Sequence, residues 1–170
     1  MKEIRGNMWD LTPQYDAVCI TTNGYVKYDG SAVMGRGCAR QAWKMFPGIE
    51  YRLGRVIQTS GLVVEAINED PLILSFPVKP ASRVISDLRQ VVRHKRQLYH
   101  IGATVPGWAC VADLEIIANS AFDLALYANT YELKKVLLPR PGCGAGELLW
   151  ADVRPVLEKW LDDRFTCVTY

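Results

Sequence analysis

The sequence lacks paired cysteines and long apolar runs. Its five cysteines are scattered, odd in number and without a Cys-x-x-Cys pair, so neither a disulfide framework nor a zinc site is indicated. No apolar run approaches the roughly 20 residues that span a bilayer, and the charged start at residues 1–5 does not resemble a signal peptide. We therefore expect no metal, no membrane association and a reducing cytoplasm.

A strong charge imbalance is also absent. The formal net charge is +2 and charged residues make up 22% of the chain, which gives little reason to expect a nucleic-acid or membrane surface as partner. Hydrophobic residues make up 49%, as in ordinary globular proteins. A length of 170 residues is typical of one domain, residues 1–170, with a real core.

Several sharp catalytic and cofactor motifs are missing. Without Gly-x-x-x-x-Gly-Lys-Ser/Thr, a P-loop phosphotransferase is disfavoured. The glycine spacing after the first predicted strand is not Gly-x-Gly-x-x-Gly, which argues against an NAD-dependent dehydrogenase. Neither a Gly-x-Ser-x-Gly elbow nor a His-Glu-x-x-His motif occurs. We expect no bound cofactor.

The most informative stretch that is present is a glycine loop. An apolar run at residues 136–138 is followed by two prolines and then by Gly142, Gly144 and Gly146. Glycine allows backbone N–H groups to approach a ligand closely, and a helical pattern that starts near Trp150 would add free N–H groups. We interpret the stretch as a loop that holds the phosphates of a nucleotide, although a simple tight turn would show the same pattern.

Strand and helix patterns alternate along the chain. The expected strands cover residues 2–8, 17–21, 62–67, 72–76, 135–138 and 165–170. The expected helices cover residues 38–46, 49–58, 82–99, 113–127 and 150–161. Residues 102–107 are expected to form a loop. This order predicts an α/β sheet with helices on both faces.

Four polar or glycine-rich elements follow the ends of predicted strands. They are Asn7, Asn23, Lys79 and the loop at residues 142–146. Because ligands of open α/β sheets bind at that edge, we expect these elements to converge on one crevice. The Met34-Gly35-Arg36-Gly37 stretch opens a helix and is a second candidate cradle. Two glycine segments facing each other would suit a diphosphate between two sugars.

Each of these elements has a structural alternative. Asn23 can satisfy a turn through its side chain, and Lys79 can be a solvated surface lysine. Residues 35–37 can serve only as the start of a helix. Cys143 as a nucleophile would need a nearby base, and the only histidines lie in the basic segment at residues 89–100. The basic cluster at residues 89–96 suits a solvated helix face or an acidic partner.

Four motifs together resemble a macrodomain. They are Thr-Thr-Asn-Gly at 21–24, Ala-Val-Met-Gly-Arg-Gly-Cys-Ala at 32–39, Phe-Pro-Val-Lys at 76–79 and Leu-Pro-Arg-Pro-Gly-Cys-Gly at 138–144. The resemblance is strongest to the branch of phage and bacterial ADP-ribose-1''-phosphate-processing proteins and the terminal ADP-ribose protein glycohydrolase. It implies a three-layer α/β/α fold with a mixed six-stranded sheet and an ADP-ribose cleft at the strand ends. The segment at residues 82–112 is longer than that branch usually has.

The resemblance also implies where the ligand lies. Asn7 and Met8 would lie by the adenine, and Tyr170 would cover the adenine or its ribose. The distal ribose would face Asn23 together with Met34, Gly35, Arg36 and Gly37. The diphosphate would be wrapped by the loop made of Pro141, Gly142, Cys143, Gly144, Ala145 and Gly146.

The chemistry that the resemblance implies is hydrolysis. In the glycohydrolase branch a lysine attacks the anomeric carbon with help from a loop aspartate. Lys79 matches the lysine, whereas Gly146 stands at the aspartate position, and Glu147 beside it is the candidate to replace the aspartate if the loop turns it inward. A second route uses a water molecule oriented by Asn23 and the loops.

Three functions from different classes therefore stay open. The first is a hydrolase of ADP-ribose-1''-phosphate or of an ADP-ribosyl adduct on protein or nucleic acid. The second is a non-catalytic ADP-ribose reader, and the third is an unrelated nucleotide-binding α/β protein. We expect the chain to be a monomer.

Overall fold

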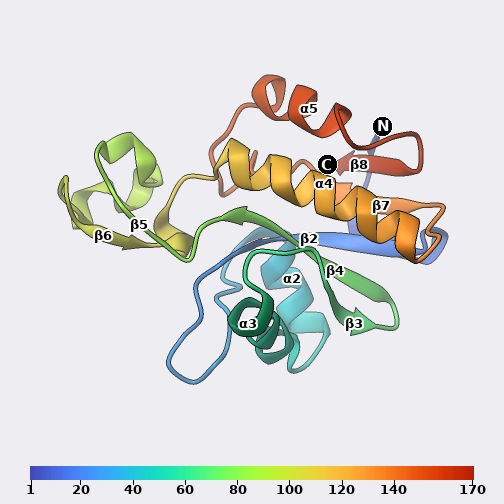
Figure 1. Ribbon diagram of the computed structural model, residues 1–170, viewed down its shortest axis with the longest axis horizontal. Coiled ribbons are helices and arrows are strands. Elements are labelled where there is room, and N and C mark those ends of the chain that lie inside the picture. The colour runs from blue at the N-terminus through green and yellow to red at the C-terminus, as the bar shows by residue number, and fades with distance from the viewer.

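The computed structural model describes all residues, 1–170, and its centre is a six-stranded mixed sheet (Figure 1). The strands are β1 (Lys2–Arg5), β2 (Ala17–Asn23), β3 (Ala66–Glu69), β4 (Leu72–Lys79), β7 (Val136–Pro139) and β8 (Phe165–Thr169). Their order across the sheet is β1-β8-β7-β2-β4-β3. All neighbours pair in parallel except β3, which runs antiparallel to β4.

Helices cover both faces of this sheet. The helices are α1 (Met8–Leu11), α2 (Gly37–Met45), α3 (Ile49–Ser60), α4 (Leu114–Thr130) and α5 (Trp150–Glu158), and the short 3-10 helix η1 (Thr12–Gln14) follows α1. Helices α4 and α5 lie on one face, and α2 and α3 lie on the other (Figure 1). The predicted three-layer α/β/α fold is therefore confirmed. None of the helices is both long and apolar enough to span a bilayer.

Alternating side chains on the strands explain the two layers. On β2, Ala17 and Cys19 belong to the core beneath α4 and α5, whereas Val18 and Ile20 belong to the core beneath α2 and α3. Successive side chains of a strand point to opposite faces, and all four of these are buried. A continuous apolar run therefore predicts a strand that is covered on both sides.

The parallel strands bring their carboxyl ends to one edge of the sheet. The strands β1, β8, β7, β2 and β4 all run in the same direction, so Gly6, Asn23, Lys79, Arg140 and Tyr170 follow or end strands at that edge. Asn23 and Lys79 are direct neighbours in the pairing of β2 with β4, next to a β-bulge at Thr22 and Asn23. The sheet therefore gathers the predicted polar elements.

Residues 80–112 form a separate unit, which we call the β5–β6 arm. It contains the antiparallel hairpin of β5 (Ser82–Val84) and β6 (Thr104–Pro106) and the 3-10 helices η2 (Leu88–Gln90), η3 (Arg93–Leu98) and η4 (Gly107–Ala109). Figure 1 shows the hairpin projecting to one side of the sheet. The arm has a small core of its own, made of Ile85, Val91, Val105, Ala109 and Cys110.

The arm corrects two expectations. The helix predicted over residues 82–99 is wrong, because β5, η2 and η3 occupy that range, and the loop predicted over 102–107 contains β6 and the start of η4. The helical spacing rested on four apolar residues, but Val84 and Leu88 are 66% and 38% exposed, while Val91 and Val92 are buried. These residues therefore do not share one buried helix face.

Two predicted strands are shorter than expected. Strand β3 begins at Ala66 rather than at residue 62, and the backbone before it bonds to the Ser75 side chain as well as to the Ser75 N–H of β4. The Ser75 hydroxyl donates to the Val63 carbonyl oxygen at 2.9 Å, and the Glu65 N–H donates to the Ser75 hydroxyl at 3.1 Å. Strand β1 ends at Arg5, and residues 8–11 form α1 instead. The other four predicted helices are confirmed, with shifted ends.

Candidate ligand-binding cleft

A cleft of about 710 Å³ opens at the carboxyl edge of the sheet. Residues at the ends of all five parallel strands line it, among them Gly6, Asn23, Lys79, Arg140 and Thr169. The remaining walls come from the start of α2, the glycine loop and the arm. A concave site at this edge is where open α/β sheets bind ligands.

Two glycine segments present free backbone N–H groups to this cleft. The N–H groups of residues 37–39, at the start of α2, donate to no backbone carbonyl, and the Arg40 N–H is the first that does. In the glycine loop, the N–H groups of residues 144–146 likewise donate to no backbone carbonyl. All six residues line the cleft. Clustered N–H groups of this kind bind anionic oxygens.

Glycine serves different purposes at different positions of these two segments. A Cβ on Gly35, Gly37 or Gly144 would meet no atom within 4 Å, so packing does not require glycine at these positions. A Cβ on Gly146 would run into the carbonyl oxygen of Gly142. Gly144 and Gly35 therefore keep space open in the cleft, whereas Gly146 lets the loop fold tightly.

Lys79 lies beneath the glycine loop as a buried amine. Its residue is 7% exposed, and its Nζ donates to the carbonyl oxygens of Ala145 at 2.9 Å and of Trp108 at 3.5 Å. Burial lowers the pKa of Lys79 to about 8; the Cys110 thiol and the Glu147 carboxylate oppose this shift, and Arg36 adds to it. The alternative that Lys79 is a solvated surface lysine is therefore wrong.

Asn23 is held in place by its own side chain. Its Nδ2 donates to the Val33 carbonyl oxygen at 2.8 Å, and its Oδ1 accepts from the Tyr25 N–H at 3.0 Å. The amide thereby joins the end of β2 to the loop that leads to α2, and it also lines the cleft. Asn23 therefore forms the expected turn and also lies at the expected crevice.

The charges that line the cleft are of one sign. The basic lining residues are Arg36, Lys79, His94, Lys95 and Arg140, and no aspartate or glutamate lines it. Arg140 is fixed by an ion pair with Glu3 at 2.9 Å and stacks on Trp150 with its guanidinium carbon 4.8 Å from the ring centre. A cleft lined by one sign of charge concentrates ligands of the opposite sign, so this cleft favours an anion.

The far end of the cleft is bordered by the last residue. Tyr170 is 77% exposed, and its hydroxyl accepts a hydrogen bond from Gln41 Nε2 at 3.3 Å. The Gln41 Oε1 in turn accepts from the Trp9 indole N–H at 3.0 Å. These bonds connect α1, α2 and the carboxyl end of β8 across one side of the cleft.

The cleft contains most, but not all, of the predicted site residues. Those that line it are Met8, Asn23, Gly35, Arg36, Gly37, Lys79, Gly142, Cys143, Gly144, Ala145, Gly146 and Tyr170. Four others lie outside the lining. Asn7 caps α1 by accepting from the Trp9 N–H at 3.1 Å, and Met34 is buried in the core beneath α2 and α3. Pro141 does not line the cleft, and Glu147 bonds to Arg93.

The site also contains residues that the sequence did not indicate. Gln41 lies one helical turn after Gly37, so the helix predicted at residues 38–46 could have indicated it. His94, Lys95 and Trp108 reach the cleft from the arm. The single helix that was predicted over residues 82–99 would not bring these residues back to the edge of the sheet, so this wall was not predicted.

Comparisons with known proteins agree on the fold. No protein-family model matches the sequence, and no curated protein matches it. The macrodomain of Mycobacterium tuberculosis DarG superposes with a TM-score of 0.68 at 18% identity, covering 99% of this chain and 97% of that one. The macrodomain of Thermus aquaticus DarG gives a TM-score of 0.67 at 19% identity, with the same coverage.

A third structure adds a bound ligand. Thermosipho africanus DarTG in complex with ADP-ribose gives a TM-score of 0.66 at 15% identity, covering 98% of this chain and 41% of that longer one. At identities of 15% to 19% these likenesses establish the fold. The sequence motifs resemble those of macrodomains, and these superpositions show that the chain has the macrodomain fold.

Proposed function

We propose that this protein binds ADP-ribose in the cleft. The observation that carries the proposal is the pair of free N–H runs, residues 37–39 and 144–146, in one cleft that has basic and no acidic side chains. A diphosphate has anionic oxygens on opposite sides, and each run supplies donors for one side. DarTG from Thermosipho africanus, which shares the fold, was solved in complex with ADP-ribose.

The proposed ligand runs along the carboxyl edge of the sheet. We place the adenine near Met8 and Tyr170, the diphosphate between the two glycine segments, and the distal ribose near Asn23 and Lys79. Met8, Tyr170, Asn23 and Lys79 all line the cleft, as do both glycine segments. The exposed ring of Tyr170 suits stacking on a base.

We further propose that the protein hydrolyses an ADP-ribosyl derivative through Lys79. Burial keeps a useful fraction of this amine neutral near neutral pH, and a neutral amine is a nucleophile. The Nζ lone pair would attack the anomeric carbon of the distal ribose. The bond to the leaving group then breaks, and the leaving group takes the electron pair and a proton. Water displaces Lys79 afterwards, which releases ADP-ribose and restores the amine.

A water route is the alternative for the same cleft. Here a water molecule near Asn23 would attack directly, and Lys79 would only stabilise the departing group. In this route the leaving group takes the proton that the water gives up, since no carboxylate lines the cleft to accept it. The leaving group could be a phosphate, as in ADP-ribose-1''-phosphate, or an ADP-ribosyl adduct on protein or nucleic acid.

A panel of ADP-ribosylated substrates tests the proposal. The panel holds ADP-ribose-1''-phosphate, ADP-ribosylated protein and ADP-ribosylated DNA, and released ADP-ribose or phosphate is the readout. Release from at least one substrate that stops in Lys79→Ala supports lysine-based hydrolysis. Release that continues in Lys79→Ala supports the water route. Binding without release from any substrate would make the protein a reader of ADP-ribose.

A further inference from the structure

Glu147 has a backbone conformation that is unusual for its residue type. Its φ is +62°, and the only other non-glycine residue with positive φ is Glu132 at +54°. Such a conformation costs about 1 kcal/mol or more for a residue with a side chain, and glycine would adopt it freely. Three glycines precede Glu147 in the same loop. A side chain at position 147 therefore needs an interaction that offsets the cost of this backbone conformation.

That interaction is a hydrogen bond to the arm. The Oε1 of Glu147 accepts from the Arg93 backbone N–H at 2.9 Å, across 54 positions of sequence. Arg93 is the first residue of η3, in the basic part of the arm. A carboxylate acceptor makes this bond stronger than a bond between neutral groups. Glu147 thus ties the glycine loop to η3.

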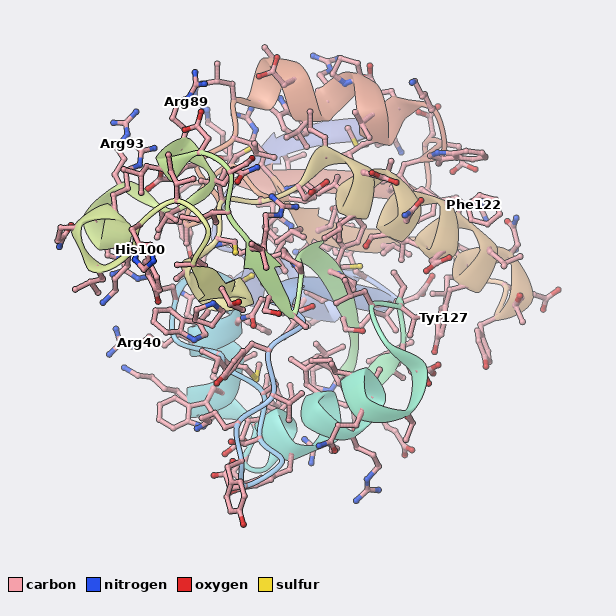
Figure 2. All side chains as sticks on the ribbon, turned by 60° about the vertical axis from the view of Figure 1, so that its left-hand side comes forward. Arg40, Arg89, Arg93, His100, Phe122 and Tyr127 are labelled. Carbon is pink, nitrogen blue, oxygen red and sulfur yellow. The ribbon has the colours of Figure 1, made fainter.

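The arm needs such ties because its core is separate from the cores that flank the sheet. Its inner side nevertheless forms a wall of the cleft, through Val92, His94, Lys95 and Trp108. Figure 2 shows Arg89 and Arg93 on the outer side of the arm, with their side chains directed away from the sheet. The place of the wall therefore depends on links to the sheet and the glycine loop.

Other links join the arm to the same loop. The Ala112 N–H donates to the Gly146 carbonyl oxygen at 2.9 Å. Lys79 contacts the Ala145 and Trp108 carbonyl oxygens from below. These links lie at the base of the arm, whereas Glu147 reaches η3, which carries His94 and Lys95. The carboxylate of Glu147 is thus the link that reaches η3 itself.

We propose that Glu147 is a positioning residue that couples the glycine loop to the wall formed by Val92, His94, Lys95 and Trp108. A diphosphate that orders the loop then also fixes the wall next to Lys79. The wall contacts whatever group is attached to the distal ribose. The effect of this coupling on the ligand rests on the proposed function, but the hydrogen bond between Glu147 and Arg93 can be tested without any ligand.

Hydrogen exchange of the intact protein tests the tie. Glu147→Gly removes the side chain and suits the positive φ, so the loop can keep its shape. Glu147→Gln keeps an acceptor oxygen without the charge. Glu132→Gly makes the same backbone change away from the cleft and is the matched control. We expect exchange at the Arg93 amide to rise about tenfold in Glu147→Gly, less in Glu147→Gln and not at all in Glu132→Gly. Unchanged exchange in Glu147→Gly would overturn the proposal.

Adding ADP-ribose tests the coupling. In the wild type we expect slower exchange in both residues 142–148 and residues 91–99, and in Glu147→Gly only in residues 142–148. Equal protection of both segments in Glu147→Gly would overturn the coupling. No protection of the wild-type loop would instead refute ADP-ribose binding, while the ligand-free comparison would still decide whether the tie exists.

Turnover separates positioning from simple structural damage. With the substrate that the wild type cleaves, we expect Glu147→Gly to lower kcat about tenfold while its affinity for free ADP-ribose changes less than about twofold. Glu147→Gln should keep most of the wild-type kcat, because the amide oxygen can still accept from the Arg93 N–H. This variant lacks the negative charge beside Lys79. A kcat equally low in both variants would overturn a positioning role through Arg93.

Discussion

The Nζ of Lys79 lies 2.9 Å from the carbonyl oxygen of Ala145, in the middle of the glycine loop. This bond places the buried amine directly beneath the segment whose N–H groups we expect to hold a diphosphate. Lys79 also neighbours Asn23 in the pairing of β2 and β4. The anion cradle and the candidate nucleophile are therefore parts of one small structure at the edge of the sheet.

The first prediction concerns the role of this amine. Lys79→Ala should reduce release of ADP-ribose by about 1,000-fold or more, since it removes the nucleophile. ADP-ribose affinity should fall less than about fivefold, because the backbone N–H groups that hold the diphosphate are unchanged. Turnover assays and calorimetry on the same preparation measure both quantities. Full activity in a folded Lys79→Ala protein would exclude the lysine mechanism.

A second prediction concerns the pH profile. Burial lowers the pKa of Lys79 to about 8, and only the neutral amine can attack. The value of kcat/KM should therefore rise about tenfold per pH unit below pH 8 and level off above it. Initial rates from pH 6 to pH 10 measure the profile. A rate that does not change across this range would show that no such amine limits the reaction.

The third prediction concerns stability, for which the sign follows from linkage. The pKa of Lys79 is lower in the folded chain than the ordinary 10.5, so between about pH 8 and 10.5 the unfolded chain binds more protons. The folded state thus bears a penalty below pH 8 that disappears by pH 10.5. Lys79→Met should be more stable than the wild type by about 1 to 3 kcal/mol at pH 7.

Urea unfolding at a series of pH values measures this difference. The advantage of Lys79→Met should narrow as the pH rises from 8 to 10.5. If the stability advantage of Lys79→Met stays constant or widens over this range, then burial does not destabilise the protonated form of Lys79.

The fourth prediction contrasts two glycines of one loop. Gly144→Val should leave the thermal midpoint nearly unchanged, because a Cβ there meets no atom within 4 Å. It should weaken ADP-ribose binding about 100-fold or more, since the side chain fills the space of the diphosphate. Gly146→Ala should instead lower stability by about 1 to 3 kcal/mol, because its Cβ runs into the Gly142 carbonyl.

Thermal unfolding and calorimetry distinguish these two effects, and Gly35→Glu provides the same test from the opposite side of the cleft. Gly35 also has open space around its Cβ position. If Gly144→Val and Gly35→Glu both fold and bind ADP-ribose as the wild type does, then the two segments do not hold the ligand.

The layers of the fold could be predicted because local patterns determine them. The alternation on β2 assigns Ala17 and Cys19 to one core and Val18 and Ile20 to the other, and the apolar spacing of α4 places Ile117, Ala121 and Leu124 in a buried row. The convergence of Asn23, Lys79 and the glycine loop followed from the rule for parallel strands. These features depend on residues close in sequence or on general topology.

The arm could not be predicted in the same way. Val84, Leu88, Val91 and Val92 have helical spacing, but the arm folds around its own core, which pairs residues about 20 positions apart, such as Ile85 and Val105. The bond from Glu147 to Arg93 spans 54 positions, and no local pattern reports it. Glu147 was a catalytic candidate because of its place in the chain, whereas its contact is visible only in the folded structure.

The most direct test of the account is calorimetric titration of the wild-type protein with ADP-ribose. We predict one binding site per chain, with a dissociation constant in the micromolar range or below, that disappears in the folded Gly144→Val variant. Heat with NAD or ATP but none with ADP-ribose, or equal ADP-ribose affinity in Gly144→Val and the wild type, would contradict the proposal that two runs of backbone N–H groups grip its diphosphate.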